Sequence, residues 1–275
     1  MMLSMGSQVT LQEVTASIQK PRQVIVGLVV NFVLIPATTI GLLYLFHANP
    51  AVSAGFLILA VCPGAPIGPP FVAIAKGDVP YATGLMVLLA GMSAIVSPML
   101  LGVLLPRLVA AGGELRIDYF AIVRTLLVSQ MLPLAAGLGL HRWSPKLASM
   151  ISKPLGVLAN LLLLIVVALL LVQQSESLAT IRLRGWCGML LLLALSLAIG
   201  WLCGGPGLAA RKALAVTTAS RNAAVALVIA SVNFAGTPAV TAVVAYALLS
   251  IFMTLGCAFL LATVPPTAPG SPECS

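Results

Sequence analysis

Eight apolar runs of about 20–26 residues, joined by short polar connections, make up most of the sequence. They lie at residues 22–46, 52–75, 81–106, 120–140, 154–173, 185–204, 213–235 and 238–263. About 20 apolar residues in an α-helix cross the hydrocarbon core of a bilayer, so each run predicts one membrane-spanning helix. A helix satisfies its own backbone hydrogen bonds in lipid. We therefore predict an all-α membrane protein that is embedded in the lipid bilayer.

The composition excludes several functional classes. Hydrophobic residues make up 60% of the chain and charged residues 7%, whereas a soluble domain is about 25% charged. The net charge of +8 is scattered over the connections and forms no basic stripe, so we expect no nucleic-acid partner. The five cysteines and two histidines have no metal-ligand spacing. We therefore expect no metal site, no cofactor and no enzymatic activity.

Both ends of the chain differ from the apolar runs between them. Residues 1–21 predict an N-terminal interfacial segment, with an amphipathic helix over Leu11–Lys20 that Pro21 ends. Residues 264–275 are rich in Pro, Ser and Thr, and predict a disordered tail. With a cytoplasmic start, eight loop Lys and Arg residues lie on the cytoplasmic side and five on the other. The positive-inside rule then predicts a cytoplasmic C-terminus.

The second run cannot be one continuous helix. Pro63, Gly64 and Pro66 lie in the segment Cys62–Pro70, which contains four prolines. Each proline removes a backbone donor, and its ring clashes with the preceding turn. Irregular backbone at this depth is tolerated only where protein or a water-lined cavity satisfies the freed carbonyls. We therefore predict a broken helix that lies in the protein interior.

The seventh run carries a permanent charge near its middle. Arg221 lies in the polar segment Thr217-Thr218-Ala219-Ser220-Arg221-Asn222. A charge at this depth costs about 2.5–3.5 kcal/mol on insertion scales, and marks a functional site by default. Fourteen residues separate Pro63 from Gly77 and also Asn222 from Gly236. Interrupted helices at corresponding positions are typical of transporters with inverted repeats.

Four groups of motifs carry a resemblance to a known family. They are Pro21-Arg22-Gln23 with Asn31–Pro36; Ala60–Gly64 with Ala75–Val79; Met131–Gly137 with Ser144–Leu147; and Ala219–Ala226. Their order and spacing over residues 5–262 resemble the bile acid/sodium symporter family, including its bacterial branches. The resemblance implies ten spans in two inverted repeats, forming a core and a panel domain. It also implies a substrate site at two crossing helices beside two sodium sites, and a place in the bacterial inner (plasma) membrane.

The chain departs from the family pattern in length. Met5–Leu11 looks like the end of the family's second span, which leaves about eight of the ten spans. We favour a truncated gene model over a functional eight-span protein. A truncated or inactive transporter fragment therefore stays open as an alternative.

The chain also departs from the family at the sodium ligands. The serine-asparagine pair of sodium-coupled members falls on Gly68 and Pro69, and the hydroxyl ligands of the fifth span fall on Ala82 and Met86. The glutamate falls on Thr217 and the glutamine on Arg221. A cation beside Arg221 would meet a repulsion of about 4 kcal/mol at 4 Å and an effective dielectric constant of about 20.

We therefore predict a secondary transporter of a small organic anion, working by alternating access without sodium. A sodium-dependent bile acid/organic anion symporter is the alternative, and an intramembrane enzyme is a weaker one. The candidate substrate-binding residues are Arg221, Asn222, Ser220, Thr217, Thr218, Pro63, Gly64, Pro66 and Asn31.

Each of the polar candidates also has a structural interpretation. Arg221 could tie off carbonyls of the helix broken at Pro63–Pro70. Asn31 could make a helix–helix hydrogen bond. The hydroxyls of Thr217, Thr218 and Ser220 could bond to the preceding helical turn.

Overall fold

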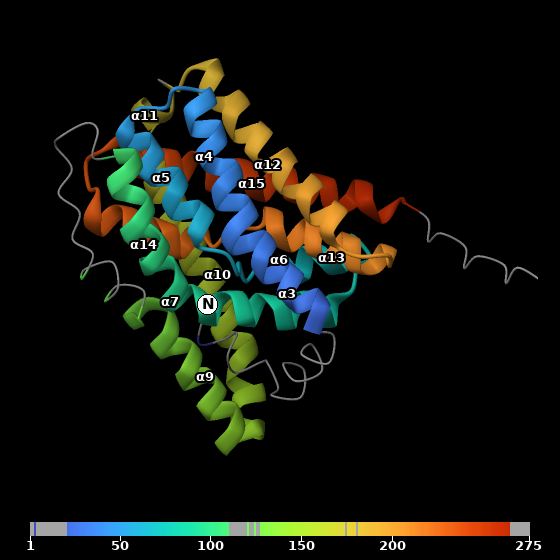
Figure 1. The fold of residues 1–275 in the computed structure, drawn as a ribbon. Helices are drawn as coiled ribbons and strands as arrows, with labels where there is room; N and C mark the ends of the chain where they lie inside the picture. The colour runs from blue at the N-terminus through green and yellow to red at the C-terminus, as the bar shows by residue number, and fades with distance from the viewer. Residues whose placement is uncertain are drawn as a thin grey trace, which may run out of the picture.

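The structure is a computed structural model that describes residues 3, 21–109, 120, 124, 127–173, 175–179 and 181–264. These residues form helices and no strand (Figure 1). The expected interfacial helix, the first part of the fourth apolar run and nearly all of the tail lie outside the described residues. The all-α fold predicted from the apolar runs is confirmed for the described part of the chain.

Two long helices flank a broken one in each half of the bundle. The first half contains α3 (Pro21–Val29), η1 (Val30–Leu34), α4 (Ile35–Leu45), α5 (Pro50–Val61), α6 (Gly68–Ile74) and α7 (Val79–Val109). The second contains α12 (Leu183–Cys203), α13 (Leu208–Ala219), α14 (Ala223–Asn233) and α15 (Pro238–Ala262). Between the halves lie η3 (Leu127–Met131), α9 (Leu132–Trp143), α10 (Pro145–Gln173) and α11 (Ser175–Ala179). The repeated order matches the predicted repeats.

Five helical segments are long and apolar enough to cross a membrane, among the residues described. They are Pro21–Leu45, Val79–Leu108, Leu183–Cys203, Leu208–Asn233 and Pro238–Ala262. The shorter α5 is also apolar. The molecule is therefore an integral membrane protein that crosses the bilayer several times, while the count of eight spans stays a prediction.

A turn of π-helix joins α3 to α4 in one continuous rod. In η1 the N–H of Ile35 donates to the carbonyl of Val30, five residues earlier. Pro36 follows the turn and has no N–H to donate, which favours this wider hydrogen-bond spacing. The same order recurs at η3, which ends two residues before Pro133. A proline thus widens each of these helices without ending it.

Close packing of helix backbones holds the bundle around the broken helices. A Cβ on Gly55 of α5 would lie 2.6 Å from the carbonyl oxygen of Ala239 in α15. A Cβ on Gly200 of α12 would lie 2.6 Å from the Cα of Ala215 in α13. Small residues at such contacts let transmembrane helices approach each other closely, where lipid gives no hydrophobic drive to associate. Tyr246 of α15 is the largest fully buried side chain of the core.

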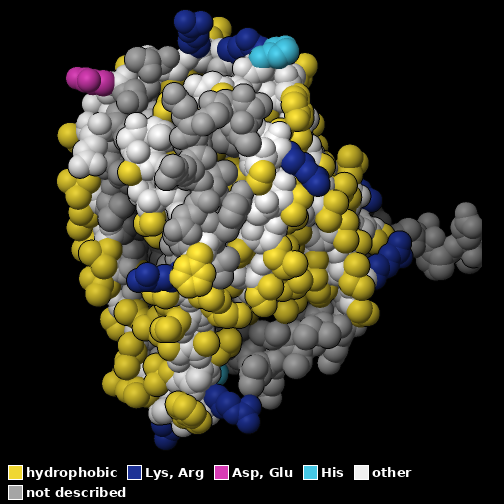
Figure 2. All heavy atoms as spheres, turned by 60° about the vertical axis from the view of Figure 1, so that its left-hand side comes forward, with side chains coloured by type: hydrophobic (Ala, Val, Ile, Leu, Met, Phe, Trp, Pro, Cys, Tyr) yellow, Lys and Arg dark blue, Asp and Glu magenta, His cyan; other side chains and the backbone are white. Residues whose placement is uncertain are grey.

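Apolar side chains cover much of the outer surface. Figure 2 shows hydrophobic side chains along both sides and across the lower half of the visible face. On α10, Val157 is 70% exposed and Leu169 is 59% exposed, and α9 extends below the rest of the bundle in Figure 1. A monomeric soluble protein rarely exposes contiguous apolar surface on this scale. Lipid contact accounts for this surface.

Candidate functional site: the crossing of the broken helices

The two broken helices meet at their interruptions. The first interruption, residues 62–67, separates α5 from α6, and the second, residues 220–222, separates α13 from α14. The backbone N–H of Asn222 donates to the carbonyl of Cys62 at 2.9 Å. This bond joins segments 160 residues apart in the chain. The predicted pair of broken crossing helices is confirmed.

Prolines leave carbonyls of the first broken helix without their helical donors. Pro63 cannot donate to the carbonyl of Leu59, and Pro66 cannot donate to that of Cys62. The carbonyl of Leu59 accepts instead from the N–H of Cys62 at 3.2 Å. The carbonyl of Cys62 accepts from the N–H of Asn222. The second broken helix thus supplies a donor that the first one lacks. The freed carbonyl is paired, as buried backbone groups in native structures generally are.

Three further carbonyls of this break accept side-chain hydrogen bonds. Arg221 Nη1 donates to the carbonyl of Ala60 at 3.3 Å, and Ser97 Oγ of α7 donates to that of Val61. Asn222 Nδ2 makes a longer contact of 3.5 Å to the carbonyl of Gly64. The side-chain oxygen of Asn222 also accepts from the N–H of Val225, which caps the start of α14.

Arg221 is the charged group of this crossing, and it is 5% exposed. One nitrogen, Nη1, bonds to the carbonyl of Ala60, as the structural interpretation of this residue requires. The other nitrogen, Nη2, is buried without a hydrogen-bond partner among the described residues. The described acidic residues lie elsewhere, since Asp78 caps the start of α7 and Glu176 belongs to α11. Arg221 is thus a buried cation with a free donor and no described counter-ion.

The remaining polar candidates gather around the same crossing. Asn31 Nδ2 donates to the carbonyl of Gly27 at 2.9 Å and contacts Thr218 Oγ1 at 3.4 Å, so it makes the helix–helix contact considered for it. Ser220 Oγ bonds back to Val216 in its own helix. Thr217 Oγ1 and Asn31 Oδ1 are buried and have no partner among the described residues.

Pro63, Gly64 and Pro66 shape the backbone at the crossing. Gly64 has a φ of +84°, and a Cβ on it would lie 2.6 Å from the backbone nitrogen of Ala90 in α7. Glycine is needed here for both reasons, because L-residues avoid this φ and no space remains for a side chain. Pro63 is buried and Pro66 is half-buried. These three residues therefore position the carbonyls, and their side chains offer no polar group to a ligand.

Comparison with known proteins places this fold in a family. The sodium bile acid symporter family matches residues 1–181 of the 275-residue chain. The chain belongs to this family. The resemblance inferred from the sequence motifs is thereby confirmed.

Two curated relatives give the family context. The chain is 24% identical over 151 residues to a probable sodium/metabolite cotransporter of Arabidopsis thaliana chloroplasts, a match that covers 55% of this chain and 36% of the relative. It is 21% identical over 242 residues to an uncharacterised sodium-dependent transporter of Bacillus subtilis, covering 87% of this chain and 74% of the relative. The chain thus spans about a third of the plant protein's length. Family and relatives agree on a membrane transporter of the symporter type.

Some positions that the family resemblance assigned to sodium ligands lie at this crossing, among them Gly68, Thr217 and Arg221. A Cβ on Gly68 would be 4.0 Å from the Cβ of Ser220, so the first of these positions faces the second broken helix. Ala82 and Met86 are buried on α7, and their side chains bring no oxygen. No group of three or more His, Cys, Asp or Glu that could hold a metal ion occurs among the described residues.

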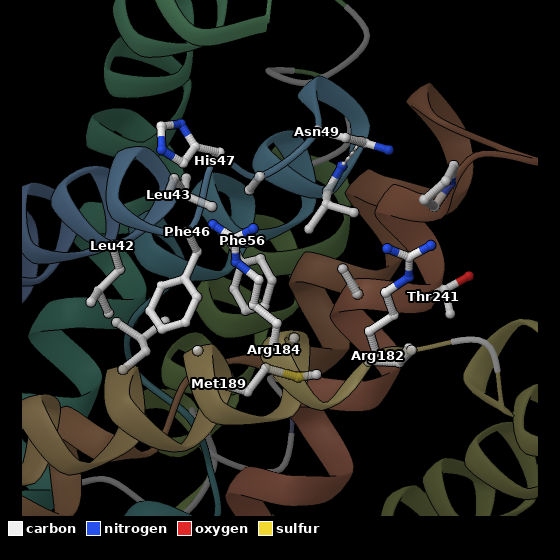
Figure 3. Close-up of a pocket in the computed structure, with 18 of the residues that line it drawn as sticks. Leu42, Leu43, Phe46, His47, Asn49, Phe56, Arg182, Arg184, Met189 and Thr241 are labelled. Atoms are coloured by element: carbon white, nitrogen blue, oxygen red, sulfur yellow. Dashed lines mark hydrogen bonds between the residues drawn. The ribbon is translucent and has the colours of Figure 1, made fainter.

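Sequence reasoning missed a cavity of about 870 Å³ at one end of this symporter-family bundle. Its walls come from the α4–α5 connection, the start of α12 and the α14–α15 connection, with Phe46, Asn49, Arg182, Arg184 and Thr237 among the lining residues (Figure 3). Arg221 does not line it. The signal in the sequence is the pair Arg182 and Arg184 at the start of an apolar run, which by itself predicts orientation in the membrane and no cavity.

Proposed function

We propose that this protein is a secondary transporter of a small organic anion, and that the crossing of its broken helices holds the anion. The observation that supports this proposal best is Arg221, a buried guanidinium whose Nη2 has no partner among the described residues. A guanidinium binds a carboxylate through charge-assisted hydrogen bonds. Asn222, Ser220, Thr217, Thr218 and Asn31 would line the same site, with Pro63, Gly64 and Pro66 shaping its backbone.

Arg221 also supports transport without sodium. It lies where sodium-coupled members are expected to carry a neutral ligand, and the described acidic residues lie away from the crossing. Hard cations take oxygen ligands, carboxylates prominent among them. A fixed positive charge beside the substrate would replace the charge that a bound sodium ion supplies.

The second candidate function is a sodium-dependent symporter. The names of both relatives support it, because one is a probable sodium/metabolite cotransporter and the other a sodium-dependent transporter. In that case backbone carbonyls and the hydroxyl of Thr217 would have to serve as ligands. The two candidates make opposite predictions about a sodium gradient.

Uptake by purified protein in liposomes tests both candidates. A panel of small carboxylates and sulfonates is first screened by thermal shift in sodium chloride and in choline chloride, and the best anion is then used for uptake. We expect equal uptake with and without an inward sodium gradient, and loss of uptake in Arg221→Gln with retention in part by Arg221→Lys. A steep dependence on the sodium gradient would favour the second candidate, and no uptake of any anion would favour an inactive fragment.

We further propose that residues 22–263 form one transporter unit in the bacterial inner membrane, with the C-terminus in the cytoplasm. The excess of basic residues on the side of Lys76 and Arg211 supports this orientation. The cavity at Arg182 and Arg184 would then open away from the cytoplasm. Fusion of a fluorescent protein and of a periplasmic phosphatase to the C-terminus tests it, since only the former should be active.

A further inference from the structure

The cavity of about 870 Å³ has the size of a small-molecule site. Three separate helix starts contribute to its lining: Asn49 at the start of α5, Arg182 at the start of α12, and Thr237 at the start of α15. Helix starts carry unpaired N–H groups and a partial positive charge. The end of α4, whose carbonyls carry a partial negative charge, lines the same cavity, so the charged side chains decide the sign of its field.

Two arginines bring full positive charges to the cavity. Arg182 and Arg184 both line the cavity, and Figure 3 shows their side chains extending from the start of α12 toward α5 and α15. The guanidinium of Arg184 lies over the ring of Phe46, 6.0 Å from its centroid. No Asp or Glu occurs among the described residues that line the cavity. Figure 2 shows basic side chains beside a histidine at this upper end of the molecule.

Arg182 and Arg184 stand at the start of α12, where a helix favours negative charge over positive charge. The starts of α5 and α15 are capped by the side chains of Asn49 and Thr237, whereas α12 has no side-chain cap and no acidic residue in its first turn. Cations at a helix N-terminus are disfavoured, and anions there are favoured. Local conflicts of this kind are expected at functional sites. A bound anion would pair both guanidinium groups and the free N–H groups at the start of α12.

Below the arginines the cavity walls are apolar. Phe46, Phe56, Met189 and Leu192 line them, and Met189 is buried. A purely inorganic anion would leave these walls in contact with water. The lining matches a ligand with one acidic head and an apolar body.

We propose that this cavity binds an amphipathic organic anion, with its carboxylate or sulfonate held by Arg182 and Arg184 and its apolar body against Phe46, Phe56 and Met189. This site is separate from the crossing, and it does not depend on the proposed transport of an anion at Arg221. A soluble anion and an anionic lipid head group share this chemistry.

Calorimetric titration with naphthalene-2-sulfonate tests the proposal on the full chain in neutral detergent. The uncharged naphthalene-2-sulfonamide is the matched ligand control, and Arg22→Gln removes the same charge from the start of α3, away from the lining residues. We expect saturable binding of the sulfonate alone. The double variant Arg182→Gln/Arg184→Gln should raise Kd about tenfold for each arginine removed, and Arg22→Gln should not change it.

A cavity-filling variant tests the volume independently of the charges. Gly188 lines the cavity, and a Cβ on it would lie at an ordinary contact distance of 3.7 Å from the ring of Phe46, so Gly188→Leu adds apolar bulk beside that ring. We expect it to abolish sulfonate binding with both arginines present. Equal binding by wild type and the double arginine variant would overturn the proposal. So would a loss confined to Arg221→Gln, which would move binding to the crossing.

Nanodiscs distinguish the two sources of the anion. The titration is repeated in phosphatidylcholine alone and with added phosphatidylglycerol. Weaker sulfonate binding in phosphatidylglycerol, dependent on Arg182 and Arg184, assigns the cavity to a lipid head group. Equal affinity in both lipids assigns it to a soluble anion, and binding that is independent of the arginines in either lipid overturns the site.

Discussion

The crossing and the cavity both contain arginine, but the surroundings of the guanidinium groups differ in the two regions. At the crossing, Arg221 is buried and bonds to a carbonyl freed by the prolines of the other broken helix. At the cavity, Arg182 and Arg184 are exposed, and no hydrogen bond to another described residue is known for them. Arg221 thus helps to hold the fold together, whereas the contact described for the exposed pair is that of Arg184 with the ring of Phe46. The burial of an arginine therefore does not by itself show that its guanidinium is free to bind a ligand.

Glycine substitutions should separate the two regions most strongly. Gly64→Ala at the crossing combines a φ of +84° with a clash of 2.6 Å against backbone. We expect it to lower the free energy of unfolding by about 3 kcal/mol or more. Gly236→Ala at the cavity has a φ of +72° but nothing within 4 Å, and should cost about 1 kcal/mol. Thermal unfolding in detergent measures both; equal losses would contradict a tighter crossing.

Removing one hydroxyl from each region should give the next largest difference. Ser97→Ala leaves the carbonyl of Val61 unpaired in the interior, a loss of about 2 kcal/mol. Thr39→Val at the cavity removes only a bond to Ile35 one turn earlier in its own rod, and should change stability by less than about 0.5 kcal/mol. Apparent Tm values are the readout. A stable Ser97→Ala protein would show that the carbonyl has another donor.

Two asparagine caps offer a finer comparison. Asn49→Ala removes an exposed cap from α5 at the cavity, at a cost of about 1 kcal/mol. Asn222→Ala removes the cap of α14 and also the contact to Gly64, and should cost about 1 kcal/mol more. The two variants are compared by thermal unfolding in the same detergent. An equal cost would mean that the 3.5 Å contact contributes nothing.

Salt should produce the smallest effect, and on one region only. The Debye length falls from about 10 Å at 0.1 M to about 3 Å at 1 M. We expect the affinity of naphthalene-2-sulfonate for the exposed arginines of the cavity to fall about threefold over this range. The affinity of an anion at buried Arg221 should hardly change. Titrations at both salt concentrations check this, and equal salt dependence would remove the distinction.

The helical fold and the crossing were predictable because local chemistry determines them. Proline at 63 and 66 breaks a helix whatever surrounds it, and the polar segment around Arg221 marks the second interruption at the same depth. The partners were not predictable. The bond from Arg221 to Ala60 joins residues 161 positions apart, and its register depends on how two broken helices pack.

The cavity escaped prediction for a related reason. Its lining comes from three connections, and in each of them one or two polar residues near a helix start are ordinary. Asn31 shows the opposite case. Sequence reasoning singled it out for the substrate site, which stays a prediction: its amide nitrogen bonds to Gly27 and Thr218, whereas its Oδ1 has no partner among the described residues. Sequence gives the polar residues of a membrane bundle, while packing decides which of them have hydrogen-bonding capacity left.

The π turn of η1 sets how α4 is rotated about the helix axis relative to α3. An α-helix turns about 100° per residue, and a π turn holds one residue more than an α turn closed by i→i+4 bonds. Converting the π turn at Val30–Leu34 to α-helix without removing a residue would rotate everything after it by about 100°. Thr39 and Leu43, which line the cavity, would then turn away from it, while Gly27 would keep its contact with α7. The extra residue of this π turn thus determines which side chains of the rod face the cavity at one end while Gly27 contacts α7 at the other.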